Sequence, residues 1–150
     1  MVSGFFLVIL LAVFNTLGRL AGGTLSDKIG RIPLMRLVFL IQAVNMLLFS
    51  HYSLTLTLAL GVSVAGFYYG AVFAVFPAAT ADFYGLKNLG TNYGVVFTAW
   101  GLGGVIGPIT AAKIFDSTGS YAASYIISFV LLIIAAAVTF TFRPSTGGKQ

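Results

Sequence analysis

The chain has 150 residues, of which 59% are hydrophobic and only 7% are charged, and its mean hydropathy is +1.02. A water-soluble domain carries about a quarter of its residues as charged side chains, so this composition indicates a membrane protein. The net charge is +5, but the basic residues are scattered between apolar runs, which argues against nucleic-acid binding. The absence of cysteine from the sequence excludes disulfides and thiolate metal sites.

Five apolar segments are long enough to cross a bilayer as helices, which requires about 20 residues each. The predicted spans are Val2–Leu20, Ile32–Ser50, Leu54–Phe76, Tyr93–Ile114 and Tyr121–Phe142, followed by a polar tail, 143–150. The first run lacks a preceding basic residue and a small-residue cleavage pattern, so it is interpreted as a membrane helix and not as a signal peptide. The predicted fold is therefore an all-α transmembrane domain of five helices.

Basic residues in the connections predict the orientation of these spans. One set of connections carries Lys28, Arg31, Arg36, Lys87, Arg143 and Lys149, and the opposite set carries Lys113 with the neutral His51. Because Lys and Arg are retained on the cytoplasmic side, the connections 21–31 and 77–92 and the C-terminus are expected in the cytoplasm. We therefore expect a multi-pass protein of the inner or plasma membrane. An odd number of spans that starts outside also predicts that an N-terminal half is missing.

The first cytoplasmic connection has the spacing Gly23-x-x-x-Asp27-Lys28-x-Gly30-Arg31. Glycine at positions 23 and 30 allows close backbone approach and a left-handed turn. Asp27 is placed to cap a neighbouring helix and to pair with Arg31 or Lys28, and such a charge latch can hold one conformer of a protein that moves. The loop resembles the signature loop of the major facilitator superfamily. An ordinary positive-inside loop with a turn glycine is the alternative interpretation.

Arg19 is the first candidate for binding a substrate. It lies one helical turn inside the membrane from Gly23 and four residues after Asn15, so Arg19 and Asn15 share a helix face. Arginine in a membrane helix usually faces a cavity or a partner, because lipid solvates it poorly. The acidic residues all lie in loops or at span ends, so an anionic substrate would supply the counter-ion. Snorkelling to the interface, or pairing with the missing half, is the alternative.

Two further runs narrow the resemblance. Residues 76–94, FPAATADFYGLKNLGTNYG, and residues 98–108, TAWGLGGVIGP, together with the pair Gly18-Arg19, look like the oxalate/formate antiporter family within that superfamily. The resemblance covers nearly the whole chain. It implies helices 8 to 12 of a twelve-helix, two-half transporter that exchanges or takes up small carboxylates.

The same resemblance places three aromatic residues at the substrate. Tyr69 and Phe73 lie on one helix face at i, i+4 and match aromatics that line the family's cavity, where their rings would enclose a planar carboxylate. Trp100 stands where oxalate carriers have a second basic residue. Since a dianion needs two cations, Trp100 favours a monocarboxylate such as formate, lactate or pyruvate over oxalate. Packing against lipid or other helices is the alternative for Tyr69 and Phe73.

Small residues in the fourth span predict close helix packing. Backbones can touch where side chains are small, and proline kinks a helix or frees a carbonyl. The residues assigned to this packing are Gly101, Gly104, Gly107 and Pro108.

The predicted function is secondary active transport, as an antiporter or symporter, of small organic anions such as monocarboxylates or oxalate and formate. The expected partners are the anion, the lipid bilayer and the missing N-terminal half, without a cofactor, a metal or nucleic acid. One alternative is a proton-coupled drug or sugar carrier, although such carriers place a carboxylate within the membrane. Another is a truncated or structural membrane protein that is inactive alone. Enzymatic activity is not expected, because no nucleophile–base constellation is present.

Overall fold

The computed structural model describes residues 4–142, which form five α-helices joined by short connections. The helices are α1 (Gly4–Ile29), α2 (Arg31–Phe49), α3 (Thr55–Tyr84), α4 (Leu89–Thr118) and α5 (Ala122–Thr139). All five are long and apolar enough to cross a membrane. The prediction of an all-α protein with five membrane-spanning helices is therefore confirmed.

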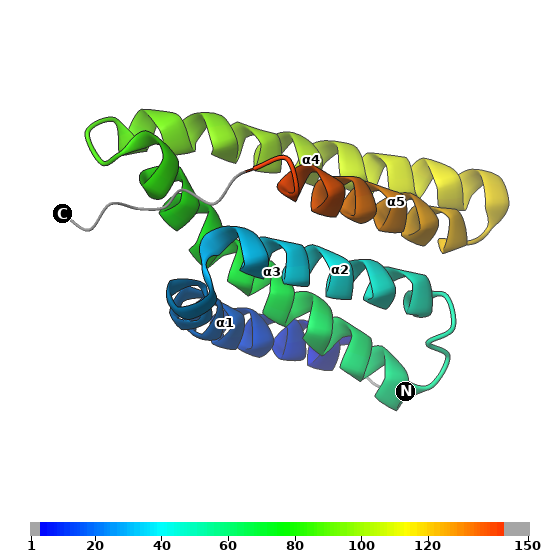
Figure 1. The fold of residues 1–150 in the computed structure, drawn as a ribbon. Helices are drawn as coiled ribbons and strands as arrows, with labels where there is room; N and C mark the ends of the chain where they lie inside the picture. The colour runs from blue at the N-terminus through cyan, green and yellow to red at the C-terminus, as the bar shows by residue number, and fades with distance from the viewer. Residues whose placement is uncertain (1–3, 143–150) are drawn as a thin grey trace.

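The helices form a tightly packed group and a loosely attached edge (Figure 1). The most extensive contact joins α1 to α3, and α2 packs on both α3 and α5. The long helix α4 has few contacts with α3 and α5, and none of its residues is buried among the described residues. The part of the chain with the fewest internal contacts is thus the helix predicted to carry a packing face.

Three of the helices, α1, α3 and α4, are longer than their predicted spans, whereas α2 has the predicted length and α5 ends at Thr139, before the predicted Phe142. α1 continues to Ile29, so most of the expected loop 21–31 is helical and the chain turns only at Gly30, whose φ is 94°. α3 runs through Pro77 to Tyr84, which shortens the expected connection 77–92 to residues 85–88. A 30-residue helix such as α3 or α4 is about 45 Å long, whereas the hydrocarbon core is about 30 Å thick. Hydropathy thus located the apolar part of these three helices and missed the turns at their ends.

Glycines allow α1 and α3 to touch backbone to backbone. A Cβ atom added at Gly18 would lie 1.9 Å from the carbonyl oxygen of Phe67, and one added at Gly70 would lie 2.0 Å from that of Asn15. Any side chain at these positions would push the helices apart. The glycines in this contact are Gly18 and Gly22 of α1, and Gly66 and Gly70 of α3.

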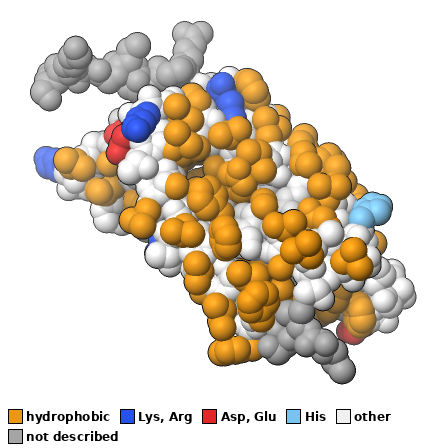
Figure 2. Space-filling model, turned by 90° about the horizontal axis from the view of Figure 1, so that it is seen from below, with side chains coloured by type: hydrophobic (Ala, Val, Ile, Leu, Met, Phe, Trp, Pro, Cys, Tyr) orange, Lys and Arg blue, Asp and Glu red, His pale blue; other side chains and the backbone are white. Residues whose placement is uncertain are grey.

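A small apolar core lies between α2 and α3. Its buried side chains are Ile32, Leu34, Met35, Val38, Ala71, Val75 and Ala79. Asn45 of α2 donates a hydrogen bond of 3.0 Å to the carbonyl oxygen of Gly61 on α3, which satisfies a polar group inside the membrane. Much of the remaining surface is apolar, and Figure 2 shows a face dominated by hydrophobic side chains, with the few charged ones near its edges.

Candidate functional site

Arg19 and its neighbours form the first part of the site. The Arg19 Nε donates a hydrogen bond of 3.1 Å to Asn15 Oδ1, one turn earlier on α1. The guanidinium carbon lies 4.8 Å from the ring centroid of Phe73 on α3, within the range of a cation–π contact. Both ion pairs among residues 4–142 involve Arg31, so within these residues Arg19 has a hydrogen bond and an aromatic face but no carboxylate partner.

An aromatic cluster continues the site from Phe73 to α4. The Phe73 ring packs edge to face on the rings of Tyr69 and Trp100. The ring centroids are 5.0 Å apart for Tyr69 and 5.5 Å apart for Trp100. Trp100 Nε1 donates a hydrogen bond of 2.9 Å to the Tyr69 hydroxyl oxygen. Phe97, which no sequence pattern indicated, stacks on Trp100 with the ring centroids 4.8 Å apart. The structure thus brings Asn15, Arg19, Tyr69, Phe73 and Trp100, all predicted as substrate-binding, into one continuous chain of contacts.

A cavity of about 470 Å³ lies beside this cluster, between α3 and α4. Its lining is almost entirely apolar and consists of Val72, Phe73, Phe76, Tyr93, Val96, Phe97, Ala99 and Trp100. Arg19 contacts Phe73 of the cavity wall and does not itself line the cavity. A cation beside an aromatic face can bind a small anion with a planar or apolar body.

The signature loop forms a charged cluster at one end of the bundle. Arg31 pairs with Asp27, as predicted, and its Nη1 also contacts the Ser26 hydroxyl. Arg31 Nε donates a hydrogen bond of 3.0 Å to Asp82 of α3, a partner that the prediction did not include. Asp82 is an acidic residue close to the end of an apolar span, and that feature marks it as a candidate partner for the loop.

Two expectations for the signature loop need correction. Gly30 caps α2 without a side-chain hydrogen bond, so Asp27 does not cap that helix. Gly23 makes no close backbone approach, because the nearest atom to an added Cβ would be the Ala74 Cβ at 4.0 Å; Gly18 and Gly22 make that contact instead. Of the two alternative partners expected for Asp27, Arg31 is the one found, and Lys28 takes part in neither ion pair among residues 4–142. Arg31 therefore does the bridging, because it lies where α1, α2 and α3 meet.

The predicted packing face of α4 is uncovered within the described part of the chain. A Cβ added at Gly101, Gly104 or Gly107 would meet no atom within 4 Å. Pro108 lies inside the helix, which continues without interruption to Thr118. The close packing expected from these residues is absent between the described helices, so any partner for this face lies outside them.

The fold and the site define the class: an all-helical, multi-pass membrane protein with an exposed arginine on α1 beside the Phe73 ring of α3. Sequence comparison gives the family. A profile of the Major Facilitator Superfamily matches residues 2–150, and the chain belongs to this superfamily of transporters.

Three members of the superfamily are similar in sequence to the chain. The chain is 36% identical over 100 residues to the uncharacterized MFS-type transporter YhjX of Escherichia coli (strain K12), covering 65% of this chain and 25% of that protein. It is 34% identical to the nitrite extrusion protein of Bacillus subtilis (strain 168), covering 79% and 32%, and 32% identical to the oxalate:formate antiporter of Oxalobacter formigenes, covering 85% and 31%. The chain thus spans about a third or less of the length of these relatives. The predicted resemblance to the oxalate/formate antiporter family is supported by the last match.

Proposed function

We propose that the chain is part of a secondary active transporter of small organic anions, with monocarboxylates preferred over oxalate. The observation that carries this proposal is Arg19, which lies in a membrane helix with Asn15 and Phe73 beside it and pairs with no carboxylate among the described residues. A guanidinium in such a place is satisfied by an anion that it can bind with two hydrogen bonds. Two relatives are named for small anions, nitrite in one case and oxalate and formate in the other.

The aromatic cluster supplies the body of the proposed site. Because Trp100 donates to the Tyr69 oxygen, the Tyr69 proton is free to be donated to a bound carboxylate. Trp100 offers no positive charge of its own, so this part of the site holds one cation. A second, unpaired carboxylate buried there would lower affinity by more than about a hundredfold. This difference is the physical basis for the preferred monocarboxylate.

Orientation and assembly belong to the same proposal. The charged end of the bundle, with Lys28, Arg31 and Lys87, faces the cytoplasm of a plasma-membrane protein, and the chain's C-terminus lies on that side. The five helices correspond to helices 8 to 12 and work with an N-terminal half that completes the transport path.

A proton-coupled drug or sugar carrier is the second candidate. Such a carrier uses a carboxylate within the membrane, yet in the described helices Asp27 and Asp82 are held by Arg31 at one end of the bundle. Anion transport therefore fits the described residues better.

Competition in proteoliposomes tests the proposed substrate class. The complete transporter is reconstituted in proteoliposomes, and uptake of labelled formate is measured in the presence of unlabelled formate, lactate or oxalate. The monocarboxylates should compete far better than oxalate. Arg19→Lys should weaken monocarboxylate uptake, because ammonium lacks the planar two-donor fork, and Trp100→Lys should shift preference toward oxalate. The matched control is Thr16→Val on the same helix, whose hydroxyl bonds its own backbone. Tight oxalate binding by the unmodified protein would show that the assignment of Trp100 is wrong.

A further inference from the structure

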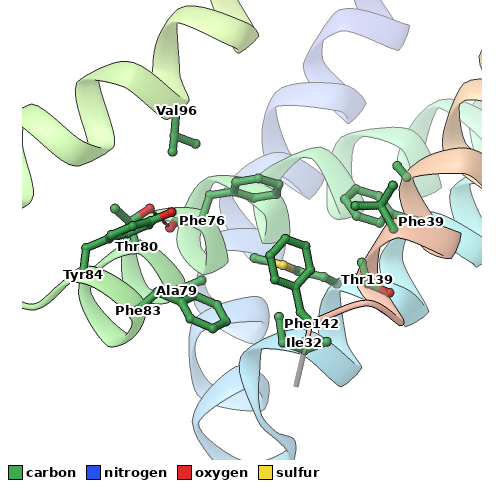
Figure 3. Close-up of a pocket in the computed structure, with 13 residues that line it drawn as sticks. Ile32, Phe39, Phe76, Ala79, Thr80, Phe83, Tyr84, Val96, Thr139 and Phe142 are labelled. Carbon is green, nitrogen blue, oxygen red and sulfur yellow. Dashed lines mark hydrogen bonds between the residues drawn. The ribbon is translucent and has the colours of Figure 1, made fainter. Parts of the chain in front are cut away.

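A second cavity of about 500 Å³ lies between α2, α3, α5 and the first turns of α4. Figure 3 shows the rings of Phe76, Phe83 and Phe142 around it, with Val96 of α4 on the opposite side. It adjoins the first cavity, since Phe76 and Val96 line both. The signature loop and the proposed anion site leave this cavity unused.

The lining offers hydrocarbon and almost no polar contact. Two threonines line it, but the Thr80 hydroxyl donates to the Phe76 carbonyl oxygen at 2.8 Å, and the Thr139 hydroxyl donates to that of Ala136 at 2.6 Å. Tyr84 carries the one other lining hydroxyl and is largely exposed, so a polar solute would lose its hydration there with few replacement hydrogen bonds. An acyl chain has no hydrogen bonds with water to lose, and each CH₂ group buried in the groove makes the free energy of binding more favourable.

A cation lies directly beside this apolar groove. Arg36 of α2 donates to Thr139, from Nε to the hydroxyl oxygen at 3.0 Å and from Nη2 to the carbonyl oxygen at 2.9 Å. Its guanidinium also lies 4.1 Å from the Phe140 ring centroid. Within the described residues Arg36 forms no ion pair, and Nη1 has no hydrogen-bond partner there. Thr139 thus fixes the guanidinium with one edge left for an oxygen ligand.

The surrounding charge favours an anion at this position. Four basic residues, Lys28, Arg31, Arg36 and Lys87, lie at this end of the helices, against Asp27 and Asp82, which Arg31 already holds. Basic pockets between membrane helices on the cytoplasmic side bind anionic lipid head groups. Arginine binds phosphate oxygens through two parallel donors.

We propose that this groove binds one anionic phospholipid, with an acyl chain between α2, α3, α5 and α4 and the phosphate on Arg36. The site uses the leaflet at the charged end of the bundle, which the proposed orientation places on the cytoplasmic side. Transport of an anion at Arg19 is not required for it, so the two proposals can fail separately.

Native mass spectrometry of the purified protein tests this site. The protein in detergent is mixed with equal amounts of phosphatidylglycerol and phosphatidylcholine that carry the same acyl chains. One phosphatidylglycerol should be retained in preference to phosphatidylcholine. Arg36→Gln should lower that preference about fivefold, because the site loses the charge that favours a net-negative head group over a zwitterionic one, whereas Arg36→Lys should keep part of it.

A matched pair on α5 tests the groove independently of Arg36, which also holds the end of α5. Ala135 lines the groove, whereas Ala137 is exposed on the same helix. Ala135→Phe should fill the groove and lower retention of phosphatidylglycerol at least about fivefold, and Ala137→Phe should retain it like the unmodified protein. Equal retention of both lipids by the unmodified protein, or equal phosphatidylglycerol retention by Ala135→Phe and Ala137→Phe, would overturn the proposal.

Discussion

Two glycine-rich helix faces in this chain have opposite surroundings. On α1 and α3, glycines lie against the neighbouring backbone so closely that an added Cβ at Gly18 would overlap the Phe67 carbonyl. On α4, the glycines at positions 101, 104 and 107 meet nothing within 4 Å. The residue type is the same, and both faces lie on long apolar helices. The difference is that only one face has its partner helix within the described residues.

This contrast shows what a small-residue pattern predicts in a membrane helix. Glycine removes the steric barrier to close approach, but it does not supply the second surface. The pattern on α4 therefore predicts packing without saying which helix provides it. Because the chain spans a third or less of its matched relatives, the proposed N-terminal half is the natural source of that surface.

The largest expected effect comes from adding a side chain at Gly18, where α1 packs on α3. Gly18→Val should separate α1 from α3, because both γ-methyl groups and the Cβ would enter the Phe67 backbone. We expect the free energy of unfolding to fall by at least about 3 kcal/mol, at the upper end for overpacked sites. The measurement is SDS titration of the purified chain followed by circular dichroism.

Gly104→Val is the matched variant on α4. It introduces the same side chain where no described atom lies within 4 Å, so the free energy of unfolding of this chain should change by less than about 0.5 kcal/mol. A large loss of stability in Gly104→Val would break the comparison, because it would mean that α4 packs its glycine face within the chain.

A second test concerns the charged cluster that joins the packed helices at one end. Asp27→Asn and Asp82→Asn each remove one partner of Arg31, and both carboxylates are more than half exposed. Stability should therefore change by less than about 1 kcal/mol. Exchange by the complete transporter should fall more, by about tenfold, if the cluster holds one of two transport conformers. Because the two carboxylates share Arg31, the decrease in exchange in the double variant should be smaller than the product of the decreases in the two single variants.

Asp116→Asn provides the control on α4. Asp116 lies near the far end of that helix and forms no ion pair among residues 4–142. Its substitution should leave exchange and membrane abundance unchanged. Unaltered exchange in Asp27→Asn, at equal abundance, would remove the charged cluster from the transport mechanism.

Composition and hydropathy predicted the fold well, because each span in lipid must satisfy its own backbone hydrogen bonds and so must be helical. Helix ends were predicted poorly. α3 passes Pro77, since losing one hydrogen bond does not end a helix that is otherwise packed, whereas Gly30 ends α1 with a positive φ.

In the candidate site, contacts within one helix were predicted, whereas most contacts between helices were not. Asn15 and Arg19 share a face of one helix, and so do Tyr69 and Phe73, so the helical period alone placed each pair together. Contacts between helices depend on register and crossing, which the period does not fix. For this reason Asp82 was missed as a partner of Arg31, and so was Phe97 as the ring stacked on Trp100.

The smallest expected effect concerns the side-chain hydrogen bond that links α4 to the packed helix α3. The hydrogen bond from Trp100 to Tyr69 is the one side-chain hydrogen bond that joins α4 to α3 among the described residues. Trp100→Phe keeps an aromatic ring against Phe73 and Phe97 and removes the donor together with one ring of the indole. The free energy of unfolding should fall by about 0.5 to 1 kcal/mol, at the low end for a lost hydrogen bond and a smaller ring, because both side chains are nearly half exposed.

Comparison with Tyr69→Phe sharpens this last test, because that variant removes the same hydrogen bond together with the Tyr69 hydroxyl proton. If the hydroxyl only anchors α4, both variants and their double variant should weaken formate uptake equally, by about twofold to threefold. If the hydroxyl also donates to the carboxylate, Tyr69→Phe should weaken uptake by about a further tenfold, as for a hydrogen bond to a charged group. Formate affinity in proteoliposomes separates these outcomes. A Trp100→Phe variant more impaired than Tyr69→Phe would contradict both, since the indole would then contribute more than its hydrogen bond.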